Sequence, residues 1–173
     1  MISGLIHVPR PADPEAVDRL ADTLSALIAG VAAGLVGDAV IVSPYATEAL
    51  EAVAEGSGAA LVVQGDAGRP WRAGAQAARR EWVLCLEAGD IPREGWVRTL
   101  DRFVGTARPE EALARLRRPH AALSERIAAR IERVIGAGCP RAGDLVRRAS
   151  LLAGPRFAPR LGPRRLPERL ERA

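Results

Sequence analysis

The chain has 173 residues, of which 48% are hydrophobic and 27% charged, a balance typical of a globular protein with one domain. All 25 basic residues are arginine, which excludes a phosphate-binding loop that depends on lysine. Residues 1–106 carry 9 arginines against 14 acids, and residues 107–173 carry 16 against 7. The basic second part indicates either an anionic partner or a solvated arginine-rich face.

Location and redox state follow from two further features. The start of the chain lacks the basic flank of a signal peptide, and the longest uncharged run, residues 23–37, is shorter than the ~20 residues of a membrane-spanning helix. We therefore expect a cytoplasmic protein. Cys85 and Cys139 lie far apart, and Cys85 falls in an apolar run, so we expect it to be a buried free thiol.

The first elements are a strand and a helix. Residues 3–9 form a short apolar run that stops at Pro9, as expected of a buried strand. A helix follows, with Asp13 as its N-cap and Pro14 at its first position, and its apolar residues recur three and four apart until Gly34.

The alternation of strand and helix continues through residue 105. The remaining expected strands are 38–44, 59–64 and 81–89, and the helices are 47–56, 71–80 and 93–105. Trp82 to Leu86 is uninterruptedly apolar, which indicates burial on both faces of the fourth strand. Four strand–helix pairs with short connections predict a three-layer α/β/α fold with a mostly parallel sheet. In such a sheet, ligands bind beyond the carboxyl ends of the strands.

The pattern changes after residue 106. Residues 121–135 predict a helix, and residues 143–154 fit a strand or a short helix. Residues 155–173 contain four prolines and six arginines, so we expect an extended or poorly ordered tail with one closing helical turn.

Acidic residues follow the fourth strand. Glu87 and Asp90 are placed where carboxylates at the rim of a sheet can hold Mg²⁺ or Mn²⁺. The alternative for Asp90 is that it caps the next helix.

The residues around this acidic loop belong to a longer pattern, Gly68-Arg69, Gly74, Ala78, Leu86, Ala88 and Pro92. This pattern resembles the central segment of family-two glycosyltransferases with the GT-A fold, and is most similar to a small bacterial subgroup. There the chain runs from Gly-Arg through Asn-x-Gly and an alanine-rich helix to an apolar strand and a Leu-(Asp or His)-Ala-Asp motif. The order of elements over residues 2–105 agrees with that family.

The resemblance implies a nucleotide-diphospho-sugar transferase-like protein. The donor would be a nucleotide-diphosphate sugar bound by Pro9, Arg69, Trp71, Arg72 and Gly74. Glu87 and Asp90 would hold Mg²⁺ or Mn²⁺, and the arginines would stabilise the diphosphate leaving group. Residues 143–154 are faintly similar to a Val-Arg-Arg segment of the family, which makes Asp144 the candidate for deprotonating the acceptor hydroxyl.

Several positions depart from the family. Its metal-binding aspartate falls on Gly89, Arg72 replaces the asparagine, and Ser43 to Ala46 stand where acidic residues end the second strand. An ungapped match places Arg141 at the acceptor-activating position. Two hypotheses follow: an active glycosyltransferase, or a catalytically degenerate GT-A-like module for binding or assembly.

The resemblance also suggests how the chain is organised. We expect a nucleotide-sugar-binding core at 1–106, a short acceptor-side extension of the same domain at 107–154, and the tail at 155–173. The tail's arginines suit an anionic membrane surface, which would place the protein at the periphery of the inner membrane. Nucleic acid is disfavoured, because Phe157 is the tail's one aromatic residue and no binding motif is present.

The remaining aromatic and histidine residues are interpreted from their places in the expected elements. Trp82, Trp96 and His7 fall on apolar runs and are expected in the core. Trp71 lies between two arginines at the start of a helix, where it either packs in the core or stacks on a ligand.

Overall fold

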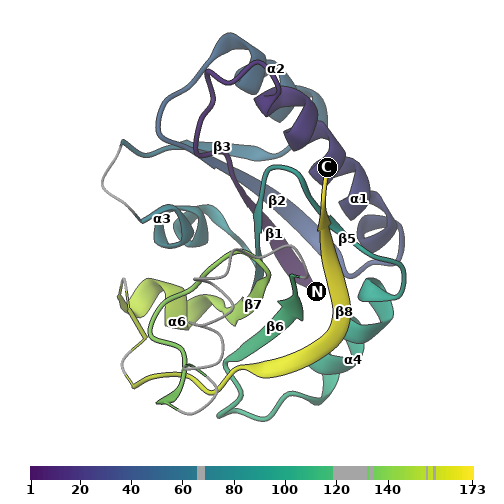
Figure 1. The fold of residues 1–173 in the computed structure, drawn as a ribbon, viewed down its shortest axis with the longest axis vertical. Coiled ribbons are helices and arrows are strands. Elements are labelled where there is room, and N and C mark those ends of the chain that lie inside the picture. The colour runs from purple at the N-terminus through teal and green to yellow at the C-terminus, as the bar shows by residue number, and fades with distance from the viewer. Residues whose placement is uncertain (66–68, 119–131, 133–134, 155, 158) are drawn as a thin grey trace.

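A mixed sheet of eight strands organises the residues that the computed structural model of the chain describes, with the order β3-β2-β1-β4-β7-β6-β8-β5 (Figure 1). The described residues are 1–65, 69–118, 132, 135–154, 156–157 and 159–173. The strands are β1 (Ile2–His7), β2 (Val36–Ser43), β3 (Ala60–Val63), β4 (Trp82–Glu87), β5 (Asp90–Pro92), β6 (Leu113–Arg117), β7 (Asp144–Arg147) and β8 (Arg164–Arg172).

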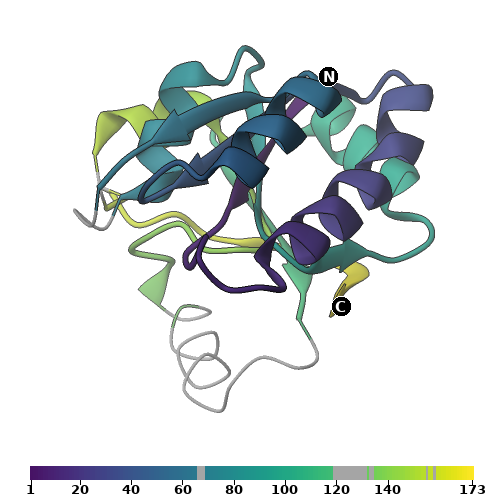
Figure 2. The same ribbon diagram turned by 90° about the horizontal axis from the view of Figure 1, so that it is seen from above.

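Helices cover both faces of the sheet (Figures 1 and 2). They are α1 (Ala16–Ala32), α2 (Glu48–Ser57), α3 (Pro70–Ala77), α4 (Trp96–Thr106) and α6 (Arg148–Ala153). Residues of α1, α2 and α4 belong to one hydrophobic core, and residues of α3 and α6 belong to a second core. The predicted three-layer α/β/α fold is therefore confirmed. No helix in the described part of the chain is long and apolar enough to cross a membrane.

The four strands expected from the first 90 residues lie side by side. β1 pairs in parallel with β2 and with β4, and β2 pairs in parallel with β3. β4 is buried on both faces, as predicted: Val83 contributes to the core under α3, and Leu84 to the core under α1. Cys85 is a buried free thiol, and Trp82 and Trp96 are core residues, which confirms these three expectations.

The start of α1 differs from the prediction. The helix begins at Ala16 with Glu15 at the N-cap, so Asp13 is not the cap and Pro14 is not the first helical residue. Instead, the Asp13 carboxylate accepts a hydrogen bond from the Glu15 backbone N–H at 3.1 Å and pairs with Arg19. The Asp13 carboxylate thus binds the backbone just before the helix and an arginine of its first turn.

The second part of the chain adds antiparallel strands to the sheet. β7 pairs antiparallel with both β4 and β6. Residues 143–154 contain both candidate elements, because β7 leads directly into α6. The helix expected at 121–135 lies outside the described residues, apart from 132 and 135.

The last segment corrects a prediction, because residues 164–172 form β8 and make no helical turn. β8 pairs in parallel with β6 and antiparallel with β5. Leu166 and Leu170, on one face of the strand, are buried in the core under α1 and α4. Pro167, which cannot donate to a ladder, lies between Arg165 and Arg169, where the pairing of β8 with β6 shifts register. Binding of this segment to an anionic membrane stays a prediction.

Gly74 allows α3 to lie close to the sheet. A Cβ at this position would lie 2.4 Å from Leu5 Cδ1 and 2.8 Å from Val42 Cγ2. Real Cβ contacts are almost never this short, so only glycine fits here without a shift of β1, β2 or α3. Because Gly74 is buried against β1 and β2, it lines neither of the pockets described below.

Candidate functional site

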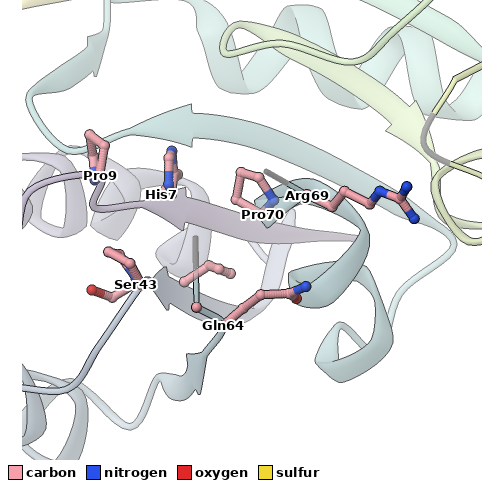
Figure 3. Close-up of a pocket in the computed structure, with 9 residues that line it drawn as sticks. His7, Pro9, Ser43, Gln64, Arg69 and Pro70 are labelled. Carbon is pink, nitrogen blue, oxygen red and sulfur yellow. The ribbon is translucent and has the colours of Figure 1, made fainter. Parts of the chain in front are cut away.

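The carboxyl ends of β1, β2 and β3 surround a pocket of about 200 Å³ at one edge of the sheet (Figure 3). His7 and Ser43 end β1 and β2, and Gln64 directly follows β3. Parallel strands bring their carboxyl ends to the same edge, which is why these residues meet. The lining residues are His7, Pro9, Val42, Ser43, Pro44, Gln64, Gly65, Arg69 and Pro70.

His7 lies between the pocket, the Trp71 ring and the end of β4. Its ring lies 5.8 Å from the ring of Trp71, edge-on at 68°, and its Cα is the register partner of Glu87 on β4. Burial lowers the pKa of His7, although the negative charge of Glu87 acts in the opposite direction. Our interpretation of His7 as a core residue is wrong: it is half-buried and lines the pocket.

Two arginines pair with the carboxylates that follow β4. Arg118 Nη2 lies 2.6 Å from Asp90 Oδ1 and 3.6 Å from Glu87 Oε2, and Arg172 Nη1 lies 2.9 Å from the same Glu87 oxygen. β6 ends directly before Arg118, and β8 brings Arg172 into register with Asp90. The lip of the sheet therefore carries two negative and two positive charges.

The two carboxylates differ in how open they are. The Asp90 side chain is 1% exposed, and its second oxygen accepts the Glu87 backbone N–H at 2.8 Å. Burial raises the pKa of Asp90 despite the charge of Arg118. The Glu87 side chain is 28% exposed. Partial burial opposes its ionisation, but Arg172 and Arg118 outweigh this effect and hold the pKa of Glu87 below its ordinary value.

This geometry bears on the predicted metal site. Within the described residues, no group of three or more His, Cys, Asp or Glu side chains is arranged to hold a metal ion. Magnesium, however, often binds through one or two carboxylates together with phosphate oxygens of a substrate. Glu87 is exposed enough for that arrangement, and its existing partners Arg172 and Arg118 both lie at Oε2, whereas both oxygens of Asp90 are already hydrogen-bonded. Of the two carboxylates, Glu87 is thus the one that fits a cation shared with a phosphate ligand.

Gly89 stands where the resembled family has its metal-binding aspartate, and its backbone explains the glycine. Its φ is +96°, and an added Cβ would lie 3.3 Å from Arg19 Cδ. Its N–H donates to Thr23 Oγ1 at 2.9 Å, inside the turn from β4 to β5. Side chains rarely adopt this backbone conformation, so an aspartate here would be strained.

Asp144 lies apart from both pockets and is paired. Its side chain has no exposed surface, and it accepts two hydrogen bonds from Arg115, at 2.5 and 2.9 Å. The backbone N–H of Arg141 donates a third, at 3.2 Å. Burial raises the pKa of Asp144, with Arg115 acting against that rise. Activation of an acceptor by this carboxylate stays a prediction, and it would require Arg115 to leave.

A second pocket, of about 230 Å³, gathers most of the other predicted site residues. Arg69, Trp71 and Arg72 line it from the start of α3. The rest of its lining comes from Pro70, Cys139, Pro140, Leu151 and Gly154. Of the predicted donor-binding residues, Pro9 and Arg69 line the first pocket.

No model of a known protein family and no curated protein matches the chain. Solved structures do match. A glucosyl-3-phosphoglycerate synthase from Mycobacterium tuberculosis, with Mn²⁺, UDP and glucosyl-3-phosphoglycerate, aligns at a TM-score of 0.59 and 15% identity over 86% of this chain and 57% of its own. The same enzyme with Mn²⁺, UDP-glucose and phosphoglyceric acid aligns at 0.65 and 17% over 100% and 72%. A further mycobacterial protein aligns at 0.64 and 16% over 100% and 67%.

The fold is that of the GT-A nucleotide-sugar transferases. At these identities the likeness concerns the fold alone. The chain spans 57% of the length of the first of these structures.

Sequence reasoning missed several residues of the candidate site. His7 and Gln64 could have been found, because each one ends or follows a predicted strand on the binding edge. Arg118 and Arg172 could not have been found this way, because their contacts with Glu87 depend on β6 and β8, which join the sheet from far away in the sequence.

Proposed function

We propose that the chain is a glycosyltransferase that binds a nucleoside-diphosphate sugar in the first pocket and transfers the sugar to an acceptor. The observation that carries the proposal is the placement of this pocket. It lies at the carboxyl ends of three parallel strands, with Glu87 on the adjacent strand. Ligands of open α/β sheets bind at this edge.

The lining of the first pocket suits a nucleoside. Pro9, Pro44 and Val42 offer nonpolar surface, and Gln64 and His7 add polar groups. Binding pockets for small molecules commonly combine a nonpolar lining with a few polar groups that fix orientation. The Gln64 amide has both a donor and an acceptor, so it can recognise one edge of a base.

The diphosphate would lie toward Glu87. A divalent cation bound there would neutralise the negative charge of the diphosphate as it leaves. Glu87 would supply one ligand, with phosphate oxygens of the donor as others. Arg118 and Arg172 hold positive charge within 3.6 and 2.9 Å of the Glu87 carboxylate. Both arginines can stabilise a leaving diphosphate from this position. The mycobacterial structures with Mn²⁺ and UDP support this part of the proposal.

Calorimetric titration of UDP and GDP, each with and without Mn²⁺, tests the proposal. We expect one of the nucleotides to bind, and to bind more tightly with the cation. Glu87→Gln should weaken the Mn²⁺-dependent binding by about tenfold, or about 1.4 kcal/mol. Glu94→Gln, a change at an exposed glutamate after β5, is the matched control and should bind as the wild type does.

The opposite outcome is equally clear. If neither nucleotide releases or absorbs heat at millimolar concentration with Mn²⁺, the chain is not a nucleotide-sugar transferase. Nucleotide binding without sugar transfer to any acceptor or to water would favour the degenerate binding module instead.

A further inference from the structure

The second pocket adjoins the first. The two pockets share Arg69 and Pro70, so only the start of α3 separates them. Trp71 lines the second pocket, and its ring contacts His7, which lines the first. A molecule in the second pocket would therefore lie next to a donor in the first.

Two positive charges line the second pocket. In the described part of the chain, Arg69 and Arg72 have neither a carboxylate partner nor a side-chain hydrogen bond. Figure 3 shows the Arg69 guanidinium extending away from His7 and Ser43. Arg72 is half-buried. Guanidinium groups without partners at a cavity can bind phosphate or carboxylate through two parallel hydrogen bonds.

The other wall of the second pocket is nonpolar. Leu151 of α6 is 1% exposed, and Pro70, Pro140 and the half-buried Trp71 ring complete the wall. This surface can pack against a hydrocarbon or ring, whereas the arginines require a negative charge. Its ligand should therefore carry an anionic group beside a nonpolar body.

We propose that the second pocket is the acceptor site and that the acceptor bears an anionic group, such as a phosphate, beside a nonpolar body. This inference rests on the proposed function, because it assumes that a donor occupies the first pocket. Arg69 and Arg72 would bind the anion, and Trp71 and Leu151 the nonpolar part.

Cys139 provides a direct probe of occupancy. It lines the second pocket and is exposed, whereas Cys85, the other of the chain's two cysteines, is fully buried. The rate of Cys139 alkylation by iodoacetamide, followed by mass spectrometry, should fall about tenfold with phenyl phosphate at roughly ten times its Kd. Phenol at the same concentration should leave the rate unchanged, and Cys85 should stay unlabelled throughout.

Two arginine variants decide where the anion binds. Arg72→Ala should weaken protection by phenyl phosphate roughly tenfold, because a charge-assisted pair is lost. Arg79→Ala removes one charge from an exposed residue just past α3 that lines neither pocket. In this variant, phenyl phosphate should protect Cys139 as well as it does in the wild type. Each protected rate is compared with the same variant's rate without phenyl phosphate, because removal of an arginine also changes thiol reactivity.

The proposed function and the acceptor site can fail separately. If UDP binds with Mn²⁺ in calorimetry but phenyl phosphate does not protect Cys139, the acceptor site is overturned and the donor site stands. The same conclusion follows if phenyl phosphate protects Cys139 equally in Arg72→Ala and Arg79→Ala. Protection without binding of any nucleotide would overturn the assignment as an acceptor site together with the proposed function.

Discussion

Two carboxylate–arginine pairs in this protein have similar chemistry and opposite environments. At the edge of the sheet, Glu87 pairs with Arg172, and their side chains are 28% and 47% exposed. In the interior, Asp144 pairs with Arg115, and their side chains are 0% and 11% exposed. Glu132 extends the interior cluster through Arg115 and Arg141.

The difference in exposure separates structural charges from charges open to a ligand. An exposed ion pair contributes little to stability, so its members can exchange partners when a ligand arrives. A buried pair cannot exchange in this way, because either charge left alone would be strongly destabilising. The Glu87–Arg172 pair is therefore the candidate for binding a diphosphate, and the interior cluster joins β6, β7 and the segment before β7.

The largest expected effect is in the interior cluster. Arg115→Ala leaves the Asp144 carboxylate buried without its arginine, which should lower the free energy of unfolding by about 3–5 kcal/mol. Urea unfolding measures the change. Glu81→Gln, which breaks an ion pair between Arg147 and a largely exposed glutamate, should cost less than about 1 kcal/mol. Equal effects of the two changes would remove the distinction between the clusters.

A smaller effect is expected in the turn at the edge. Gly89→Asp restores the residue type of the resembled family at a φ of +96°. The strain should lower the free energy of unfolding by about 1–3 kcal/mol. Thermal denaturation with and without Mn²⁺ checks this prediction. A variant as stable as the wild type would show that the turn tolerates a side chain, and that glycine is not required there.

The smallest expected effect is in the pH dependence of stability, which differs in sign between Glu87 and Asp144. The pKa of Glu87 is lowered in the folded protein, so its charge contributes stability above its ordinary value of 4.5, and this stability is lost as the pH falls through the folded pKa. The stability difference between wild type and Glu87→Gln should therefore shrink as the pH falls below 4.5. Asp144 has the opposite sign, because its pKa is raised and its ionisation costs stability as the pH rises. A difference for Glu87 that grows on acidification would contradict the account.

The first half of the fold could be predicted because its signals are local. Each of the first four strands is a short apolar run next to an amphipathic helix, and parallel pairing with helical crossovers then fixes their common edge. That logic brought Pro9 and Arg69 to the first pocket. The same logic failed for His7. It belongs to the same apolar run as the buried centre of β1, but as the last residue of the strand it lies at the edge of the sheet and lines the pocket.

The second half could not be predicted in the same way because its order depends on distant partners. β8 is rich in arginine and contains a proline, and it becomes a strand because Leu166 and Leu170 fill the core beneath α4 and because β5 and β6 offer free edges. The burial of Asp144 likewise depends on Arg115, 29 residues earlier in the chain. Nothing in the local sequence indicates either contact.

The most direct test of the central claim, that the first pocket holds a nucleotide, compares the two glutamines of the chain. Gln64 lines the pocket, whereas Gln76 lies exposed on α3. In calorimetric titration with UDP and Mn²⁺, Gln64→Ala should raise the Kd by about fivefold to tenfold through loss of a hydrogen bond to the base, and Gln76→Ala should leave the Kd unchanged. Equal affinities for wild type and both variants, or no binding by any of them, would contradict the account.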